Sequence, residues 1–147
     1  MSHPVKKVKV LIYLTHFYPH LGGVERYIEE LFSRIVDKQN FEVHIIALDN
    51  SSVREETYRG MHVHRVRSIF SVGNVFLLPN PRDLKRCVNG LLKQHSFKYV
   101  VTVTRFFYTS YLGMGLARRI KASHIHIEHG GGFVQHPSLL IRLGSAW

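Results

Sequence analysis

Two adjacent glycines lie between a predicted strand and a predicted helix. Gly22 and Gly23 follow the apolar residues 8–14 and precede a helical pattern that starts at Val24. Such a pair lets the backbone turn tightly and leaves N–H groups uncovered at a helix N-terminus, which favours phosphate or another anion. Glu25 suits the helix dipole but brings a carboxylate close to any bound anion. A packing role for the glycines is an equal alternative, since a lone Gly-Gly is a weak motif.

Three histidines near residue 126 invite a zinc hypothesis. His124 and His126 alternate with isoleucines and so share one face of a predicted strand. A tetrahedral zinc site needs a fourth ligand besides these two histidines and His129. Only Glu128 is close enough in sequence, and its side chain would also have to reach the ion, so no metal site is expected. His129 instead stands where the strand meets a glycine loop beginning at Gly130, and its ring or backbone could contact a polar ligand. The alternative is a loop histidine satisfied by its neighbours.

Arg105 and Cys87 are the other candidates for chemistry. Arg105 follows a predicted strand and precedes two phenylalanines, so it could bind an anion or pair with Glu128 on a neighbouring strand. Cys87 falls on the buried stripe of a predicted helix, which argues against a nucleophile. A single cysteine also excludes an internal disulfide and fits a reducing compartment.

The elements that position these residues follow from the spacing of apolar side chains. Strands are predicted at 8–14, 41–48, 61–66, 99–103 and 124–128. Helices are predicted at 24–35, from Pro81 with Asn80 as N-cap, and at about 109–120. The alternating pattern of 61–66 indicates a sheet edge, whereas 49–59 reads as a polar turn region and 68–81 as a long connection. Gly113 and Gly115 are expected to allow close packing on the sheet.

Strands that alternate with helices predict one α/β domain over residues 1–147. The expected fold is a Rossmann-like parallel sheet with helices on both faces, joined by right-handed crossovers. Ligands of such sheets bind beyond the carboxyl ends of the strands, where the loops 15–23, 104–108 and 129–132 would meet. The glycine loop lacks GxGxxG and the GKS or GKT ending of a P-loop, which argues against common dinucleotide and ATP sites.

Charge is distributed unevenly along the chain. The net charge is +10, and residues 58–147 hold thirteen Lys and Arg but only Asp83 and Glu128 as acids. This excess favours phosphorylated substrates, acidic lipid headgroups or nucleic acid, although solvated helix faces would look the same. No nucleic-acid motif accompanies it, so that partner is not expected. Without an apolar segment of membrane-spanning length or a signal-peptide region, a cytoplasmic location is expected.

Two blocks of sequence carry a family resemblance. FYPHLGGVERYIEELFSRI followed by FEVHIIAL, and VVTVTRFFYTSYLGMGLARRI followed by HIHIEHGGGF, resemble the N-terminal domain of family-4 glycosyltransferases, which have the GT-B fold. The resemblance covers nearly the whole chain. It implies retaining transfer of a sugar from a nucleotide-sugar, such as a UDP- or GDP-sugar, to a glycan or lipid-linked acceptor, with no metal or other cofactor.

The resemblance also assigns roles to residues. Gly22 and Gly23 would approach the donor diphosphate or an acceptor phosphate, and His129 would contact the transferred sugar as the catalytic residue. Arg105, Glu128 and Gly130 would line the cleft. The family's C-terminal donor-binding domain is absent, so the chain is expected to be a fragment or half of a two-chain enzyme, inactive alone. The alternative is a non-catalytic basic module that binds anionic lipids or phosphorylated ligands, peripheral on the inner face of a membrane.

Overall fold

The computed structural model describes residues 6–20, 22–38, 40–52, 54–72, 76–105 and 107–129. Its strands are β1 (Val8–Leu14), β2 (Phe41–Leu48), β3 (Glu55–Tyr58), β4 (Met61–Val66), β5 (Ser68–Val72), β6 (Phe76–Pro79), β7 (Tyr99–Val103) and β8 (Ser123–Ile127). Its helices are α1 (Gly23–Asp37), α2 (Pro81–Gln94) and α3 (Tyr108–Ile120). None of these helices has the length and apolar character needed to span a bilayer.

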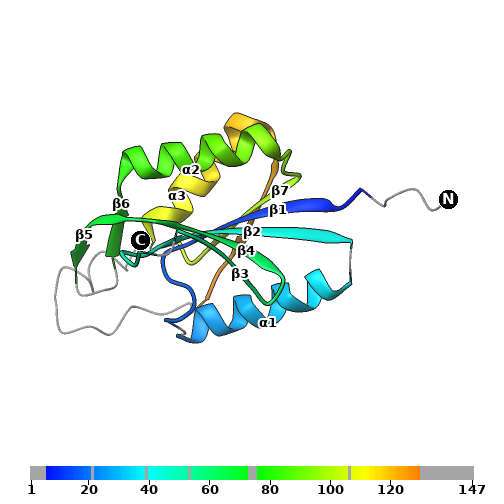
Figure 1. The fold of residues 1–147 in the computed structure, drawn as a ribbon, viewed down its shortest axis with the longest axis horizontal. Coiled ribbons are helices and arrows are strands. Elements are labelled where there is room, and N and C mark those ends of the chain that lie inside the picture. Colours follow the sequence, from blue (N-terminus) through cyan, green and yellow to red (C-terminus); the bar gives the residue numbers. More distant parts are fainter. Residues whose placement is uncertain are drawn as a thin grey trace.

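The main sheet has the strand order β3-β4-β2-β1-β7-β8. All its neighbouring pairs are parallel except β3 and β4. The chain moves outward from β1 to β2 on one side and from β1 to β7 on the other, so the strand order reverses between β1 and β7. This arrangement confirms the predicted Rossmann-like α/β fold (Figure 1).

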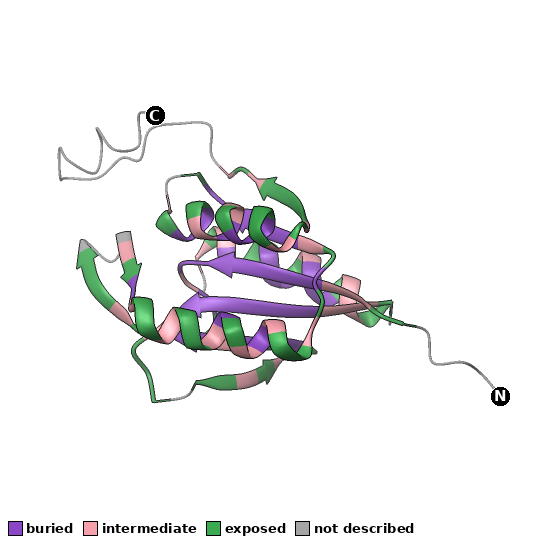
Figure 2. Ribbon diagram, turned by 90° about the horizontal axis from the view of Figure 1, so that it is seen from above, coloured by how far each residue is buried: buried purple, intermediate pink, exposed green. Residues whose placement is uncertain are grey.

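The helices cover both faces of this sheet, as predicted (Figure 1). On one face α1 packs Ile28 and Phe32 against the β1 residues Ile12 and Leu14. On the other face α2 and α3 pack against the alternate β1 residues. This cluster includes Leu11, Tyr13, Val88, Leu91 and Leu116. The central strands are accordingly buried along most of their length, while the outer faces of the helices are exposed (Figure 2).

The prediction of a sheet edge at β4 was wrong. Residues of the supposed turn region form β3, which pairs antiparallel with β4 and takes the outer position. The connecting residues Arg59 and Gly60 have φ values of 48° and 77°, as a tight two-residue hairpin turn requires. The four residues of β3, EETY, offer little apolar signal because both faces of this strand are partly solvated.

The long connection predicted at 68–81 also has more structure than expected. It contains β5 and β6, which form a separate antiparallel hairpin. At its end the predicted start of α2 is confirmed, since the Asn80 Oδ1 atom accepts hydrogen bonds from the backbone N–H groups of Arg82 at 3.0 Å and Asp83 at 3.3 Å. Pro81 occupies the first turn, where its missing N–H costs nothing.

The two glycines of α3 differ in their surroundings. A Cβ atom on Gly113 would lie 2.4 Å from Cγ2 of Thr102 and 3.2 Å from Cγ of Tyr13, so close packing on the sheet does require glycine there. A Cβ atom on Gly115 would meet nothing within 4 Å. The prediction of close packing is therefore confirmed for Gly113 and wrong for Gly115.

Candidate active site

The loops expected to carry chemistry meet at one edge of the sheet. Parallel pairing brings the carboxyl ends of β1, β7 and β8 side by side, with Tyr13 opposite Thr102 and Val103 opposite Ile127. The hydroxyls of Thr15, just after β1, and Thr109, in the first turn of α3, lie 3.0 Å apart and join two of the loops. The edge falls where the strand order reverses, which is where open α/β sheets bind ligands.

At the start of α1 the two glycines have different roles. Gly22 is the N-cap, and a Cβ atom there would lie 2.6 Å from Oε2 of Glu25, a carboxylate that is buried in the first turn. A Cβ atom on Gly23 would meet nothing within 4 Å. The helix N-terminus is therefore covered by its own carboxylate beside Gly22 and open beside Gly23, so an anion would approach from the Gly23 side.

The turn after β7 is strained. Thr104 has a φ of 60°, a left-handed conformation that costs a β-branched residue about 1–2 kcal/mol. Its backbone N–H donates to the Ile127 carbonyl at 2.9 Å, and the Ser110 hydroxyl donates to the carbonyls of Val103 and Thr104. The Thr104 hydroxyl is buried and has no hydrogen-bond partner among the described residues. Such strain, held in place by neighbours, is common at ligand sites.

His129 lies two residues after the end of β8 and against α1. Its ring meets that of Tyr27 edge-on, with 4.6 Å between the ring centroids and an interplanar angle of 70°. Tyr27 stands in the second turn of α1, so the structure brings His129 to the same end of this helix as Gly22 and Gly23. The His129 Nε2 atom is buried and has no hydrogen-bond partner within the described part of the chain. A buried unpaired nitrogen at a loop edge is a natural contact for a polar ligand.

Glu128 and Arg105 are brought together through the backbone. The Glu128 Oε2 atom accepts from the Arg105 backbone N–H at 3.3 Å and lies 3.0 Å from Nε2 of His126. Glu128 thus anchors the turn that carries Arg105. Gly130, the remaining predicted site residue, lies outside the described residues.

The other predicted histidines belong to a hydrogen-bond network. His124 Nε2 and His126 Nδ1 lie 2.8 Å and 2.9 Å from the Thr102 hydroxyl, so they share one strand face as predicted. Among the described residues the potential metal ligands that cluster tightly are Glu42, His44 and His95, in another part of the sheet.

Sequence reasoning missed two residues at this edge. Tyr27 fits the apolar stripe of α1 by spacing, yet it is 47% exposed and faces His129. Thr104 gave no signal beyond its place after a strand, because backbone strain is not visible in a sequence. A hydroxyl-bearing side chain in an otherwise apolar stripe could have pointed to Tyr27.

Cys87 is expected to be chemically inert in the folded protein. Burial, assisted by the Glu55 carboxylate, raises the pKa of the Cys87 thiol to about 12. At pH 8 its alkylation by iodoacetamide should therefore be roughly a thousandfold slower than that of an ordinary thiol. Mass spectrometry of timed samples measures this rate, and the same reaction in urea is the control. Equal rates with and without urea would contradict the prediction.

Comparison with known proteins gives a consistent result. Residues 21–147 match the family model described as Glycosyltransferase Family 4. A protein named as an uncharacterized glycosyltransferase, from Methanocaldococcus jannaschii, is 31% identical over 136 residues, covering 89% of this chain and 34% of that protein. The chain thus spans about a third of the length of this relative.

Proposed function

The chain belongs to glycosyltransferase family 4, and from that premise we propose that it forms the acceptor-side part of a retaining enzyme. The enzyme would move a sugar from a nucleotide-sugar to a glycan or lipid-linked acceptor. One observation carries this proposal: the buried Nε2 atom of His129, which has no hydrogen-bond partner among the described residues, lies at the carboxyl edge of the sheet, beside the open N-terminus of α1. At this edge a sugar hydroxyl could bind the His129 ring, and a phosphate could bind the N–H groups at the start of α1.

The proposed roles follow from these positions. His129 contacts the transferred sugar through its ring, which Tyr27 holds from the side of α1. The backbone N–H groups at Gly23 face the diphosphate, where negative charge grows as the glycosidic bond to the nucleotide breaks. Arg105 adds a cation at the same edge, and Glu128 fixes the backbone of its turn. Gly130 would continue this wall of the cleft.

A second domain would complete the site. The relative from Methanocaldococcus jannaschii is about three times as long as its matched region. We infer that the nucleoside of a UDP- or GDP-sugar binds mainly to such a domain, and that this chain alone does not turn over. Testing therefore requires the full-length protein.

The decisive test is transfer by the full-length protein carrying His129→Ala. UDP- and GDP-sugars with glycan and lipid-linked acceptors would be screened, and anomeric retention read by NMR of the product. His129→Ala should lower kcat about 10- to 100-fold because a contact to the reacting sugar is lost. His124→Ala, in β8 but away from this edge, should leave kcat unchanged. Equal activity of both variants, or no transfer from any donor, would overturn the proposal.

Gly23→Val tests the anion site separately. The new side chain would enter open space at the start of α1. We expect a loss of donor affinity of at least tenfold with little change in the free energy of unfolding, because no protein atom is displaced. Isothermal titration with the donor measures the affinity, and urea unfolding measures the stability. Unchanged donor affinity would place the diphosphate elsewhere.

One feature favours an additional membrane role. The β5 residues Ile69 and Phe70 are 61% and 55% exposed, and the hairpin leads directly into α2, whose exposed residues include Arg82, Lys85 and Arg86. Apolar and basic side chains in this order suit an anionic lipid surface. Co-sedimentation with vesicles should rise with phosphatidylglycerol content and fall with salt, and Phe70→Ser should weaken it. Binding to neutral vesicles alone would contradict this role.

A further inference from the structure

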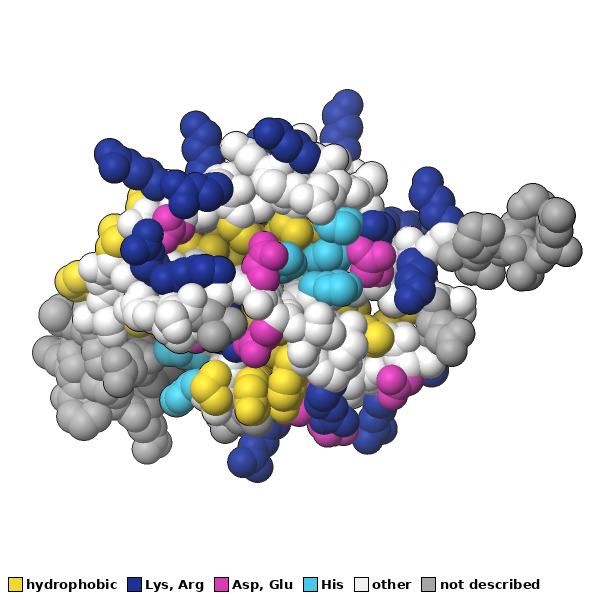
Figure 3. Space-filling model, in the orientation of Figure 1, with side chains coloured by type: hydrophobic (Ala, Val, Ile, Leu, Met, Phe, Trp, Pro, Cys, Tyr) yellow, Lys and Arg dark blue, Asp and Glu magenta, His cyan; other side chains and the backbone are white. Residues whose placement is uncertain are grey.

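Four histidines gather on the face of the sheet that α2 covers. His44 comes from β2, His62 and His64 come from β4, and His95 follows α2. The ring centroid of His44 lies 4.8 Å from that of His62, 5.3 Å from that of His64 and 4.4 Å from that of His95. Figure 3 shows a patch of histidine side chains flanked by acidic groups. This patch lies near the amino ends of the strands, away from the candidate active site.

Two histidines of this patch and the neighbouring Glu42 are arranged as a set of metal ligands. Glu42 Oε1 lies 2.8 Å from Nε2 of His44 and 3.4 Å from Nδ1 of His95. All three ligand atoms lie within 4.8 Å of one another. Tetrahedral zinc, with bonds of about 2.0–2.1 Å to nitrogen and oxygen, separates its ligands by about 3.3 Å. Two of the three separations are already within about half an ångström of that spacing, and the third, between His44 and His95, is at most 4.8 Å and would close as the His95 side chain turns toward the ion.

A positive charge already occupies this position. The Lys9 Nζ atom lies 2.7 Å from Nδ1 of His95 and 3.1 Å from Oε1 of Glu42. The side chains of Lys9 and Glu42 are only 26% and 22% exposed. Two of the three ligand atoms, on Glu42 and His95, therefore already contact a cation, and a flexible lysine is the group that a metal ion would displace.

We propose that Glu42, His44 and His95 bind a divalent cation of the zinc class, which displaces the Lys9 ammonium. Water takes the fourth position, which the partial exposure of Glu42 and His95 allows. One carboxylate and two imidazoles are a ligand set that zinc accepts. Bound there, the ion links β2 to the end of α2 and holds this helix against the sheet.

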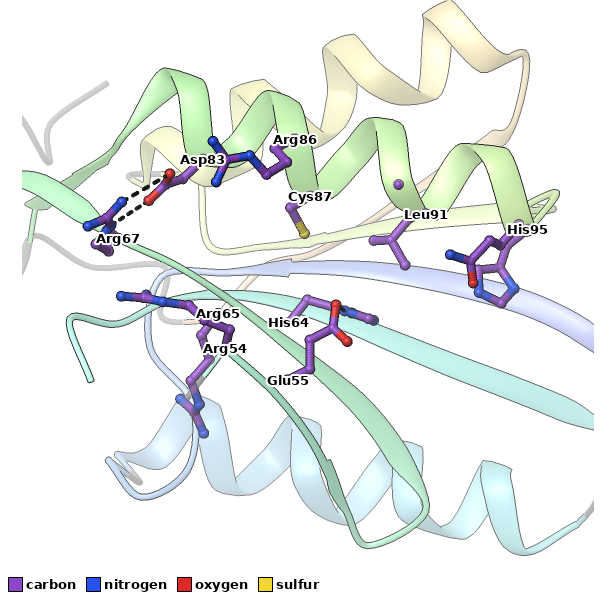
Figure 4. Close-up of a pocket in the computed structure, with 12 residues that line it drawn as sticks. Arg54, Glu55, His64, Arg65, Arg67, Asp83, Arg86, Cys87, Leu91 and His95 are labelled. Atoms are coloured by element: carbon purple, nitrogen blue, oxygen red, sulfur yellow. Dashed lines mark hydrogen bonds and ion pairs between the residues drawn. The ribbon is translucent and has the colours of Figure 1, made fainter. Parts of the chain in front are cut away.

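Neighbouring side chains, His64 and Glu55, are placed to orient His44. Its Nδ1 atom lies 3.0 Å from Nε2 of His64, whose Nδ1 atom lies 3.5 Å from Oε1 of Glu55. When Nε2 of His44 binds a metal, its Nδ1–H donates to His64, and His64 in turn presents its own N–H to Glu55. Metal-bound histidines are typically held by such outer partners. His64 and His95 also line a pocket of about 350 Å³ between β4 and α2, which gives solvent a path to the patch (Figure 4).

The protonation states suit metal binding. Burial lowers the pKa of His44 to about 4 and also holds the pKa values of His64 and His95 below their usual range. Burial alone would raise the pKa of Glu42, but hydrogen bonds with His44 and Lys9 outweigh it and bring it to about 2. Neutral imidazoles and an ionised carboxylate need lose no proton to bind an ion at neutral pH.

Zinc titration of the chelator-treated chain tests the site. We expect one zinc ion per chain by calorimetry, and Co²⁺ should give the absorption of a tetrahedral site. His95→Ala and Glu42→Gln, which alter partly exposed ligands, should each weaken binding at least a hundredfold. Lys9→Met should strengthen it at least tenfold, because no ammonium competes. A merely stabilising histidine cluster would not show this gain.

The double variant His124→Ala/His126→Ala is the matched control, since it removes two histidines from another strand. It should bind zinc as the unaltered chain does. The proposal is overturned if this control loses as much affinity as His95→Ala, or if Lys9→Met binds no more tightly. It is equally overturned if zinc binds only after Lys9 is replaced, because lysine is then the permanent occupant.

Discussion

Replacing Arg65 with methionine should lower the free energy of unfolding by about 3–5 kcal/mol. The Arg65 side chain is 3% exposed and forms ion pairs with Asp49, at 3.0 Å, and with Glu56. It also donates to the Tyr18 carbonyl in the loop after β1. Methionine replaces the aliphatic part of the arginine side chain but not its guanidinium, so Asp49, Glu56 and the Tyr18 carbonyl lose this donor. The loss of a buried partner is the main cost.

Arg67→Met is the matched control for this prediction. Arg67 is two residues further along the chain and also forms an ion pair, with Asp83 at 2.6 Å, but its side chain is 54% exposed. Its replacement should lower the free energy of unfolding far less than that of Arg65, because solvent screens the exposed pair. Urea unfolding followed by circular dichroism measures both variants. If both variants lost similar unfolding free energy, the burial of Arg65 would not be the reason for the large stabilisation by its ion pairs.

Gly113→Ala should destabilise the protein by about 1–3 kcal/mol although alanine favours helices. The added carbon would lie 2.4 Å from the Thr102 side chain and 3.2 Å from the Tyr13 ring. Both neighbours are buried in the sheet, so α3 itself would have to move away.

Gly115→Ala in the same helix should have the opposite sign. Its new carbon meets nothing, so the variant should gain about 0.5–1 kcal/mol from helix propensity alone. Thermal and urea unfolding of the two variants side by side measure the difference. If both variants were stabilised, the close approach of α3 to Thr102 and Tyr13 would be contradicted.

The central strands could be predicted from sequence because burial on two faces leaves runs in which most residues are apolar. β1, β2 and β7 have the predicted bounds. β3 could not be predicted in this way, since its side chains are largely solvated and its stability comes from pairing with β4. The same holds for the β5 and β6 hairpin, whose residues were interpreted as a connection.

At the active-site edge, sequence order was enough to predict that the ends of β1, β7 and β8 meet. The contact between His129 and Tyr27 was not predictable, because it depends on how α1 lies across the sheet. The histidine patch was missed for a related reason. His44 and His62 are far apart in sequence, and only the register of β2 on β4 places them opposite each other.

The central place of β1 in the sheet also has a consequence for synthesis of the chain. One edge of β1 pairs with β2 early, whereas the other waits for β7, which places Tyr99 opposite Val10. At about 5–20 residues per second, a ribosome needs roughly 5–20 seconds to make the intervening segment. During that interval the apolar residues Val10 to Leu14 present an unpaired strand edge to other chains. The nascent protein is therefore expected to need a chaperone most before β7 emerges, and least after it.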